Sequence, residues 1–223
     1  MLLAMDTSTQ WVGLALYDGA QVLGEITWQT HSHHTMEMAP AIQDLLQRCG
    51  VRSDMLKALG VALGPGSFTS LRIGLALAKG LSLSLRIPVV GLPTLDILAA
   101  AQPVQDLPLI ALLQAGRGRL AVGHYKPGRG RWKPQDEAVL QTLDQLVESI
   151  NDQPALVCGE LDAAARQTLS RQCKSAVLAS PARSLRRPAV LAELAWQRWQ
   201  TDKVDDVVSL APIYLRVADP IPG

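Results

Sequence analysis

Residues 70–86 read Ser-Leu-Arg-Ile-Gly-Leu-Ala-Leu-Ala-Lys-Gly-Leu-Ser-Leu-Ser-Leu-Arg, and a helix built from them would be apolar nearly all round. A ridge of large side chains runs along it between two stripes of small residues. The ridge consists of Ile73, Leu77, Leu81 and Leu85, and the stripes are Gly74, Ala78 and Ser82 on one flank and Ala76, Gly80 and Ser84 on the other. One flank can cover a β-sheet. The second flank then requires either a central core or a protein partner.

The same stretch does not predict a membrane span, because such a span needs about 20 apolar residues and Arg72 and Lys79 interrupt this run.

The chain has 223 residues, 48% of them apolar, and a net charge of +1, which predicts one or two globular domains. A charge so close to neutral argues against strong nucleic-acid binding by the whole molecule. The three cysteines form no Cys-x-x-Cys pair and the N-terminus lacks a signal-peptide pattern, so a cytoplasmic protein is expected.

The first half of the chain predicts the element order βββαβα. Hydrophobic periodicity and turn residues indicate three strands, a helix, a strand, the helix already described, a short strand and a further helix. These elements are expected at residues 2–5, 12–17, 21–28, 36–49, 59–63, 70–86, 89–90 and 93–101. Residues 102–108, with two prolines, are typical of a linker.

The second half repeats this pattern. Strands are expected at 109–113, 120–125, 138–140 and 155–158, and helices at 143–150, 162–170 and 189–199. Two βββαβα units form the architecture of the actin-like (ASKHA) ATPases. The sequence therefore predicts a duplicated α/β fold of two lobes, an N-terminal lobe over residues 1–102 and a C-terminal lobe over residues 103–223.

Three polar residues, Asp6, Thr7 and Ser8, follow the first expected strand, where an actin-like ATPase has its first phosphate loop. A carboxylate there can hold Mg²⁺ or activate water, and hydroxyls and backbone N–H groups can bind phosphate. The corresponding turn of the second half, Gln114-Ala115-Gly116, has no acidic residue, which compromises metal-assisted phosphoryl transfer. We therefore expect a vestigial phosphate loop, and the alternative is that the three residues only stabilise a turn.

A glycine-rich loop over residues 64–69 precedes the helix at 70–86. It lacks the Gly-Lys-Ser/Thr ending of a Walker loop, so it predicts a turn in which Ser67 or Thr69 caps the helix rather than an ATP site.

The segment 64–74, Gly-Pro-Gly-Ser-Phe-Thr-Ser-Leu-Arg-Ile-Gly, resembles the signature of the bacterial TsaB (YeaZ) family, with Ser70 where a glycine is usual. Segments 3–8, 34–40 and 211–216 are similar to further motifs of that family in the same order. The resemblance extends over essentially the whole chain and is strongest in its first half.

The resemblance implies a non-catalytic paralogue of TsaD. TsaD and a TsaE-type ATPase install threonylcarbamoyl on the adenosine next to the anticodon in tRNAs that read codons beginning with A, and TsaB is the dimerisation subunit. In the family, the helices at 36–49 and 70–86 pack against their counterparts in TsaD. The implied partner interface consists of Met38, Ala41, Ile42, Leu45, Leu71, Gly74, Leu75, Ala78 and Ser82.

The same resemblance bears on catalysis and ligands. TsaD-type proteins carry a His-x-x-x-His metal pair where this chain has Pro93-Thr94-Leu95-Asp96-Ile97-Leu98, so no metal site and no autonomous transfer are expected. No cofactor is expected to bind tightly, and the resemblance allows ATP or ADP to bind at the partner interface. The alternative is an ATP-dependent phosphoryl or acyl transferase that acts alone through Asp6. A homodimer of the isolated chain is a third reading.

Histidines 31, 33 and 34 with Glu37 lack the i, i+4 spacing of a helical zinc site and are expected to be exposed or to cap a helix. Four cations lie around a hairpin near Trp132, namely Lys126, Arg129, Arg131 and Lys133. They are consistent with phosphate contacts, with Trp132 stacking on a base, or with a solvated turn. The arginines at 183, 186 and 187 leave the same two alternatives. We expect tRNA to be held mainly by the partners.

Overall fold

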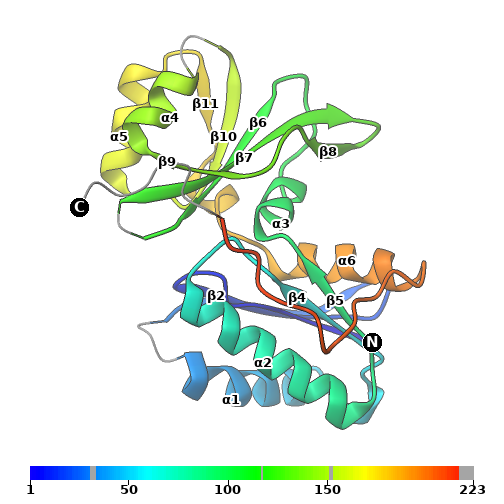
Figure 1. Cartoon of the computed structure of the whole chain (residues 1–223). Coiled ribbons are helices and arrows are strands. Elements are labelled where there is room, and N and C mark those ends of the chain that lie inside the picture. The colour runs from blue at the N-terminus through cyan, green and yellow to red at the C-terminus, as the bar shows by residue number, and fades with distance from the viewer. Residues whose placement is uncertain (31–33, 117, 151–152, 216–223) are drawn as a thin grey trace. The chain divides into compact units, whose positions relative to one another are not determined.

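The computed structural model describes residues 1–30, 34–116, 118–150 and 153–215. Its contacts divide the chain into two compact units. The first contains Met1–Ile97 and Arg186–Ile213, and the second contains Leu98–Leu185 and the C-terminal residues from Tyr214. Each unit has one mixed β-sheet with helices packed on it (Figure 1). This organisation confirms the predicted α/β fold of two units.

The first sheet has the strand order β3-β2-β1-β4-β5. The first three strands, β1 (Leu2–Asp6), β2 (Trp11–Tyr17) and β3 (Val22–Gln29), form an antiparallel meander. The strands β4 (Ala58–Ala62) and β5 (Val89–Leu92) continue the sheet parallel to β1. The helices that alternate with these strands are α1 (His34–Arg48), α2 (Phe68–Leu85) and α3 (Thr94–Ala100). The predicted order βββαβα is confirmed.

Both faces of the first sheet are covered by helices. Successive residues of β1 point to opposite faces, so their contacts show what covers each face. Leu3 and Met5 belong to a hydrophobic cluster that includes buried residues of α1 and α2. Leu2 and Ala4 belong to a second cluster with residues of α6 (Pro188–Trp199). All four side chains are 0% exposed. Figure 1 shows α1 and α2 on one side of the sheet and α6 on the other.

The position of α6 differs from the predicted division of the chain. The C-terminal lobe was expected to include all residues from 103 to 223, whereas Arg186–Ile213 return to the first unit. The reason is burial: the second face of the first sheet is apolar, and α6 supplies Leu191, Ala192 and Ala195 to cover it. The predicted helical range was close to the observed one, but its apolar face fits the other sheet.

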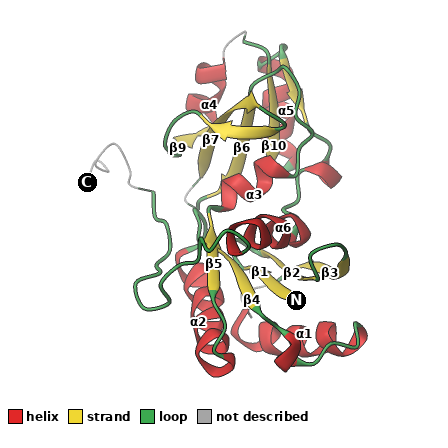
Figure 2. Cartoon of the chain, turned by 90° about the vertical axis from the view of Figure 1, so that its right-hand side faces the viewer, coloured by secondary structure: helices red, strands yellow, loops and turns green. Residues whose placement is uncertain are grey.

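The second sheet has the order β11-β10-β6-β7-β8, with β9 also paired to β7. Its strands are β6 (Leu109–Gln114), β7 (Arg119–Gly128), β8 (Arg131–Pro134), β9 (Val139–Thr142), β10 (Ala155–Gly159) and β11 (Ala176–Leu178). The helices α4 (Leu143–Ile150) and α5 (Ala163–Gln172) lie together on it (Figure 2). Two short 3-10 helices lie at Ser53–Met55 and Pro181–Arg183.

Candidate functional site

The turn after β1 is closed by hydrogen bonds within the chain. Asp6 is 2% exposed, and its Oδ1 accepts a 2.8 Å hydrogen bond from the backbone N–H of Ser8. Its Oδ2 accepts a 2.7 Å hydrogen bond from Nε of Arg186, which is 4% exposed. Both carboxylate oxygens therefore have partners inside the first unit.

The two hydroxyls of the turn are also engaged. Thr7 Oγ1 donates to the carbonyl of Ser70 at 2.7 Å, and Ser8 Oγ lies 2.8 Å from Thr94 Oγ1. These bonds connect the turn to the first residues of α2 and α3. The turn predicted as a vestigial phosphate loop therefore places its carboxylate and hydroxyls in a buried network that links three elements. Whether it binds a nucleotide stays a prediction.

Arg186 is the residue of this network whose role sequence reasoning missed. The expectation of a solvated or phosphate-binding arginine patch is wrong for it, because its guanidinium lies between Asp6, Thr9 Oγ1 at 3.1 Å and the Trp11 carbonyl at 2.7 Å. Its neighbour Arg187 is exposed and pairs with Glu25 of β3. No local pattern separates these two arginines, since the partners of Arg186 lie at the other end of the chain.

The loop before α2 has the predicted capping role. Ser67 is the N-terminal cap of α2, and its hydroxyl accepts from the Ser70 N–H. The Ser67 N–H donates to the Ser8 carbonyl at 2.7 Å, so this loop and the β1 turn are in direct contact. A side chain at Gly66 would overlap the Ser8 carbonyl, which explains the glycine there.

One flank of α2 faces the first sheet. The buried residues of the helix are Ser70, Leu71, Gly74, Leu75, Ala78 and Ser82. A Cβ at Gly74 would overlap the side chain of Thr7, so the β1 turn lies directly against this stripe. The small residues on this flank allow close packing of the helix on its own sheet.

This placement corrects the predicted partner interface. Residues Leu71, Gly74, Leu75, Ala78 and Ser82 were expected to meet a partner, but each of them is buried within the chain. Three predicted residues of α1 are buried in the same core, namely Met38, Ile42 and Leu45, while Ala41 is half-buried. The physical reason is that both small stripes of α2 have the same period, and the first unit needs one of them to cover its sheet.

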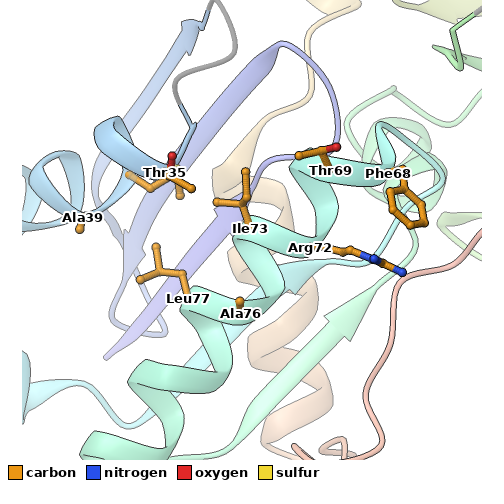
Figure 3. A pocket seen from close by; sticks show the side chains of 9 residues that line it. Thr35, Ala39, Phe68, Thr69, Arg72, Ile73, Ala76 and Leu77 are labelled. Carbon is orange, nitrogen blue, oxygen red and sulfur yellow. The ribbon is translucent and has the colours of Figure 1, made fainter.

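The other flank of α2 lines an open groove against α1. The groove has a volume of about 520 Å³ and is lined by Thr35, Met38 and Ala39 from α1 and by Phe68, Thr69, Arg72, Ile73, Ala76 and Leu77 from α2. Figure 3 shows the labelled side chains of both helices around this space. We call it the α1–α2 groove.

Large apolar side chains are exposed on both helices, and one of them, Phe68, lines the groove. Phe68 is 54% exposed, Leu83 of α2 is 70% exposed and Met36 of α1 is 74% exposed. The Arg72 guanidinium carbon lies 3.7 Å from the centre of the Phe68 ring, and this cation–π contact keeps the charge at one end of the groove. Such a patch is typical of a protein interface, because an exposed apolar surface of this kind is costly in water.

The described part of the chain has neither a cluster of metal ligands nor a helix that could cross a membrane. No group of three His, Cys, Asp or Glu side chains there is placed to hold a metal ion. Histidines 31 and 33 lie outside the described residues. Among the helices described, none is long and apolar enough to span a bilayer.

The class defined by this fold is the actin-like α/β proteins, with a covered mixed sheet in each of two units. A model of the family TsaD, tRNA N6-adenosine threonylcarbamoyltransferase, matches residues 21–177. The tRNA threonylcarbamoyladenosine biosynthesis protein TsaB of Bacillus subtilis is 31% identical over 98% of this chain and 95% of its own length. The chain belongs to the TsaB family.

Further comparisons agree with this result. The TsaB protein of Escherichia coli is 32% identical over 63% of this chain and 62% of its own length. The solved structure of YeaZ from Pseudomonas aeruginosa has a TM-score of 0.80 with 23% sequence identity, and it covers 96% of this chain and 99% of its own. The predicted family and its role in tRNA threonylcarbamoyladenosine biosynthesis are confirmed, and the alternative of a transferase that acts alone is not favoured.

Proposed function

We propose that this chain is a non-catalytic docking subunit of tRNA threonylcarbamoyladenosine biosynthesis and that its α1–α2 groove binds the TsaD-type transferase. The observation that carries this proposal is the exposed apolar groove, which lies on the flank of α2 that the first sheet leaves uncovered. This occupant is consistent with the family, in which the corresponding helices pack against TsaD.

The chemistry of the groove supports a partner of this kind. The TsaD family model matches residues 21–177, a range that includes both α1 and α2, so a TsaD-type partner has the same pair of helices. Two such pairs can pack face to face as a four-helix arrangement with an apolar core. Phe68, Leu83 and Met36 would then lose their contact with water, and this burial supplies the driving force.

Catalysis would reside on the partner. Both oxygens of Asp6 accept hydrogen bonds from this chain, which leaves the carboxylate poorly placed to bind Mg²⁺ or to activate water. The chain also has residues 93–98 where TsaD-type proteins have their His-x-x-x-His pair. We further propose that the complex works in the cytoplasm with a TsaE-type ATPase, that the partner interface can bind ATP or ADP, and that the partner holds most of the tRNA. The isolated chain would form a homodimer through the same groove.

The test mixes the purified chain with its TsaD-type paralogue and measures the mass of the complex by light scattering on a sizing column. The decisive variant is Ala76→Glu, because Ala76 is exposed in the groove and can carry a charge while the chain remains folded. We expect the wild type to form a complex and Ala76→Glu to bind at least roughly 100-fold more weakly, since a carboxylate that loses its hydration in an apolar contact costs several kcal/mol.

The matched control is Gln197→Glu, which adds the same charge at an exposed position of α6 on the opposite face of the sheet. This variant should bind the paralogue as the wild type does. Normal binding by a folded Ala76→Glu variant would overturn the groove assignment. Separate elution of both wild-type proteins, with nucleotide and TsaE present, would overturn the docking function itself.

A further inference from the structure

The hairpin of β7 and β8 gathers positive charge on one of its faces. In the register of the two strands, Lys126 lies opposite Lys133 and Gly128 lies opposite Arg131. Alternate residues of a strand share a face, so Lys126, Arg131 and Lys133 all project from the same side. Arg129 lies in the turn between the strands, and all four cations are exposed. We call this surface the hairpin cation face.

The opposite face of the hairpin packs against another segment of the same unit. Trp132, which lies opposite Pro127, is 9% exposed, and its Nε1 donates a 3.1 Å hydrogen bond to the carbonyl of Gln102. This contact excludes the alternative in which Trp132 stacks on a base, because its ring is buried within the protein. The burial of Trp132 determines which side of the hairpin meets solvent, and that side carries the cations.

The cations of this face repel one another. Like charges directly opposite on two strands are destabilising, and Lys126 and Lys133 are such a pair. The Lys133 stem also lies across Gly128, where an added Cβ would be 2.8 Å from Cε of the lysine, so this charge is directed along the hairpin toward Arg131. Within residues 118–150 and the other described ranges, none of the four cations forms an ion pair with a carboxylate.

The nearest acidic residue in the sequence, Asp136, forms no ion pair with the described cations of this face. Asp136 follows β8, and its charge acts on His124, which is half-buried farther along β7. On the same side of β7, Leu120 and Val122 belong to the core beneath α4 and α5. On this face of β7, the first residues are therefore buried in the core, and the later ones belong to the exposed group of cations.

We infer that the hairpin cation face binds the phosphodiester backbone of tRNA while the TsaD-type partner is bound. This inference rests on the proposed function, which supplies tRNA as the polyanion. Phosphate groups would relieve the repulsion between Lys126 and Lys133, and the guanidinium groups of Arg129 and Arg131 suit bidentate contacts to phosphate oxygens. Contacts of this type position a nucleic acid without reading its sequence. They also agree with the near-neutral charge of the chain, because the positive surface is local.

The test measures tRNA binding at three salt concentrations by fluorescence anisotropy, using a tRNA that reads a codon beginning with A and the complex of this chain with its TsaD-type paralogue. The variant is Lys126→Gln combined with Lys133→Gln. We expect roughly tenfold weaker binding near 0.1 M salt and a slope of log affinity against log salt that is shallower by about 2, since two phosphate contacts are removed. The control combines Arg171→Gln with Lys174→Gln, which removes two exposed cations of α5 and its C-terminal end.

The outcomes separate this inference from the proposed function. Weaker tRNA binding and a shallower slope for the hairpin variant alone, with an unchanged mass of the protein complex, support the inference. Equal affinity and slope for wild type and variant overturn it and leave the docking function intact. A loss of the protein complex in the hairpin variant also overturns it, because the face would then contact the paralogue. If the wild-type chain forms no complex, the inference is overturned together with the proposed function on which it rests.

Discussion

Arg186 and Asp6 lie 180 residues apart in the chain, yet Nε of the arginine donates to Oδ2 of the carboxylate at 2.7 Å. Both side chains are 3% exposed. The ion pair joins the turn after β1 to the segment that leads into α6, at the point where the chain re-enters the first unit. A segment that was expected to belong to the second lobe therefore completes the polar core of the first.

The Asp6–Arg186 pair should be costly to break from one side. Replacing Arg186 with Met leaves a buried carboxylate without its charged partner, so the free energy of unfolding should fall by about 3–5 kcal/mol. The double variant Asp6→Asn with Arg186→Met should be less destabilised than this single change, because no charge then remains buried. Urea unfolding followed by circular dichroism measures both. A loss below about 1 kcal/mol for Arg186→Met would be no larger than the contribution of an exposed ion pair. Such a result would contradict the prediction that the buried pair stabilises the first unit.

The two small-residue stripes of α2 should respond differently to charge. Ala78 is 0% exposed, so Ala78→Glu should destabilise the fold by several kcal/mol. Ala76 is exposed, and Ala76→Glu should change the free energy of unfolding by no more than about 0.5 kcal/mol. Thermal unfolding of the two variants in parallel makes the comparison. Equal stability of both would show that the sheet-facing flank has been assigned wrongly.

The three cysteines should differ in their reactivity. Burial raises the pKa of Cys158 to about 12, so almost no thiolate forms near neutral pH, and Cys173 is buried too. Cys49 is partly exposed at the end of α1. Titration of the native protein with a disulfide reagent at mildly alkaline pH should therefore modify Cys49 first. A Cys49→Ser variant that keeps a fast-reacting thiol would contradict this order.

His124 should make the stability depend on pH. Burial lowers its pKa below the ordinary 6.5, and the nearby charge of Asp136 only partly opposes this shift. The unfolded chain therefore binds the proton more readily, and the free energy of unfolding should decrease as the pH falls through 6.5 toward the lower folded-state pKa. Substitution by Gln should reduce this pH dependence. An NMR titration of the His124 ring in the folded protein measures the pKa directly, and a value above 6.5 would contradict the prediction.

Local periodicity was a good guide to most elements. The alternating and helical patterns of the first half predicted β1 to β5 and α1 to α3 in the observed order, because each element buries a continuous apolar face. Two strands of the second unit were not predicted as strands. β11 has only three residues, and β8 is rich in lysine, arginine and proline, so neither carries an alternating pattern.

The orientation of α2 could not be predicted in the same way. Its two small-residue stripes have the same period, so helical spacing alone assigns neither of them to the sheet. The choice is made by the Thr7 side chain, which fits against Gly74 and donates to the Ser70 carbonyl. Because Thr7 belongs to a turn that is distant in the sequence, local patterns could not predict which flank of α2 stays exposed.

The sequence by itself determined the actin-like α/β pattern, the TsaB family and a helix with more apolar surface than one sheet can cover, since these depend on residue type and local spacing. Only the tertiary structure decided which flank of α2 remains exposed, that Arg186 closes the turn at Asp6, and that Lys126 and Lys133 share a face. Each of these depends on contacts between residues far apart in the chain, and local patterns carry no information about such contacts.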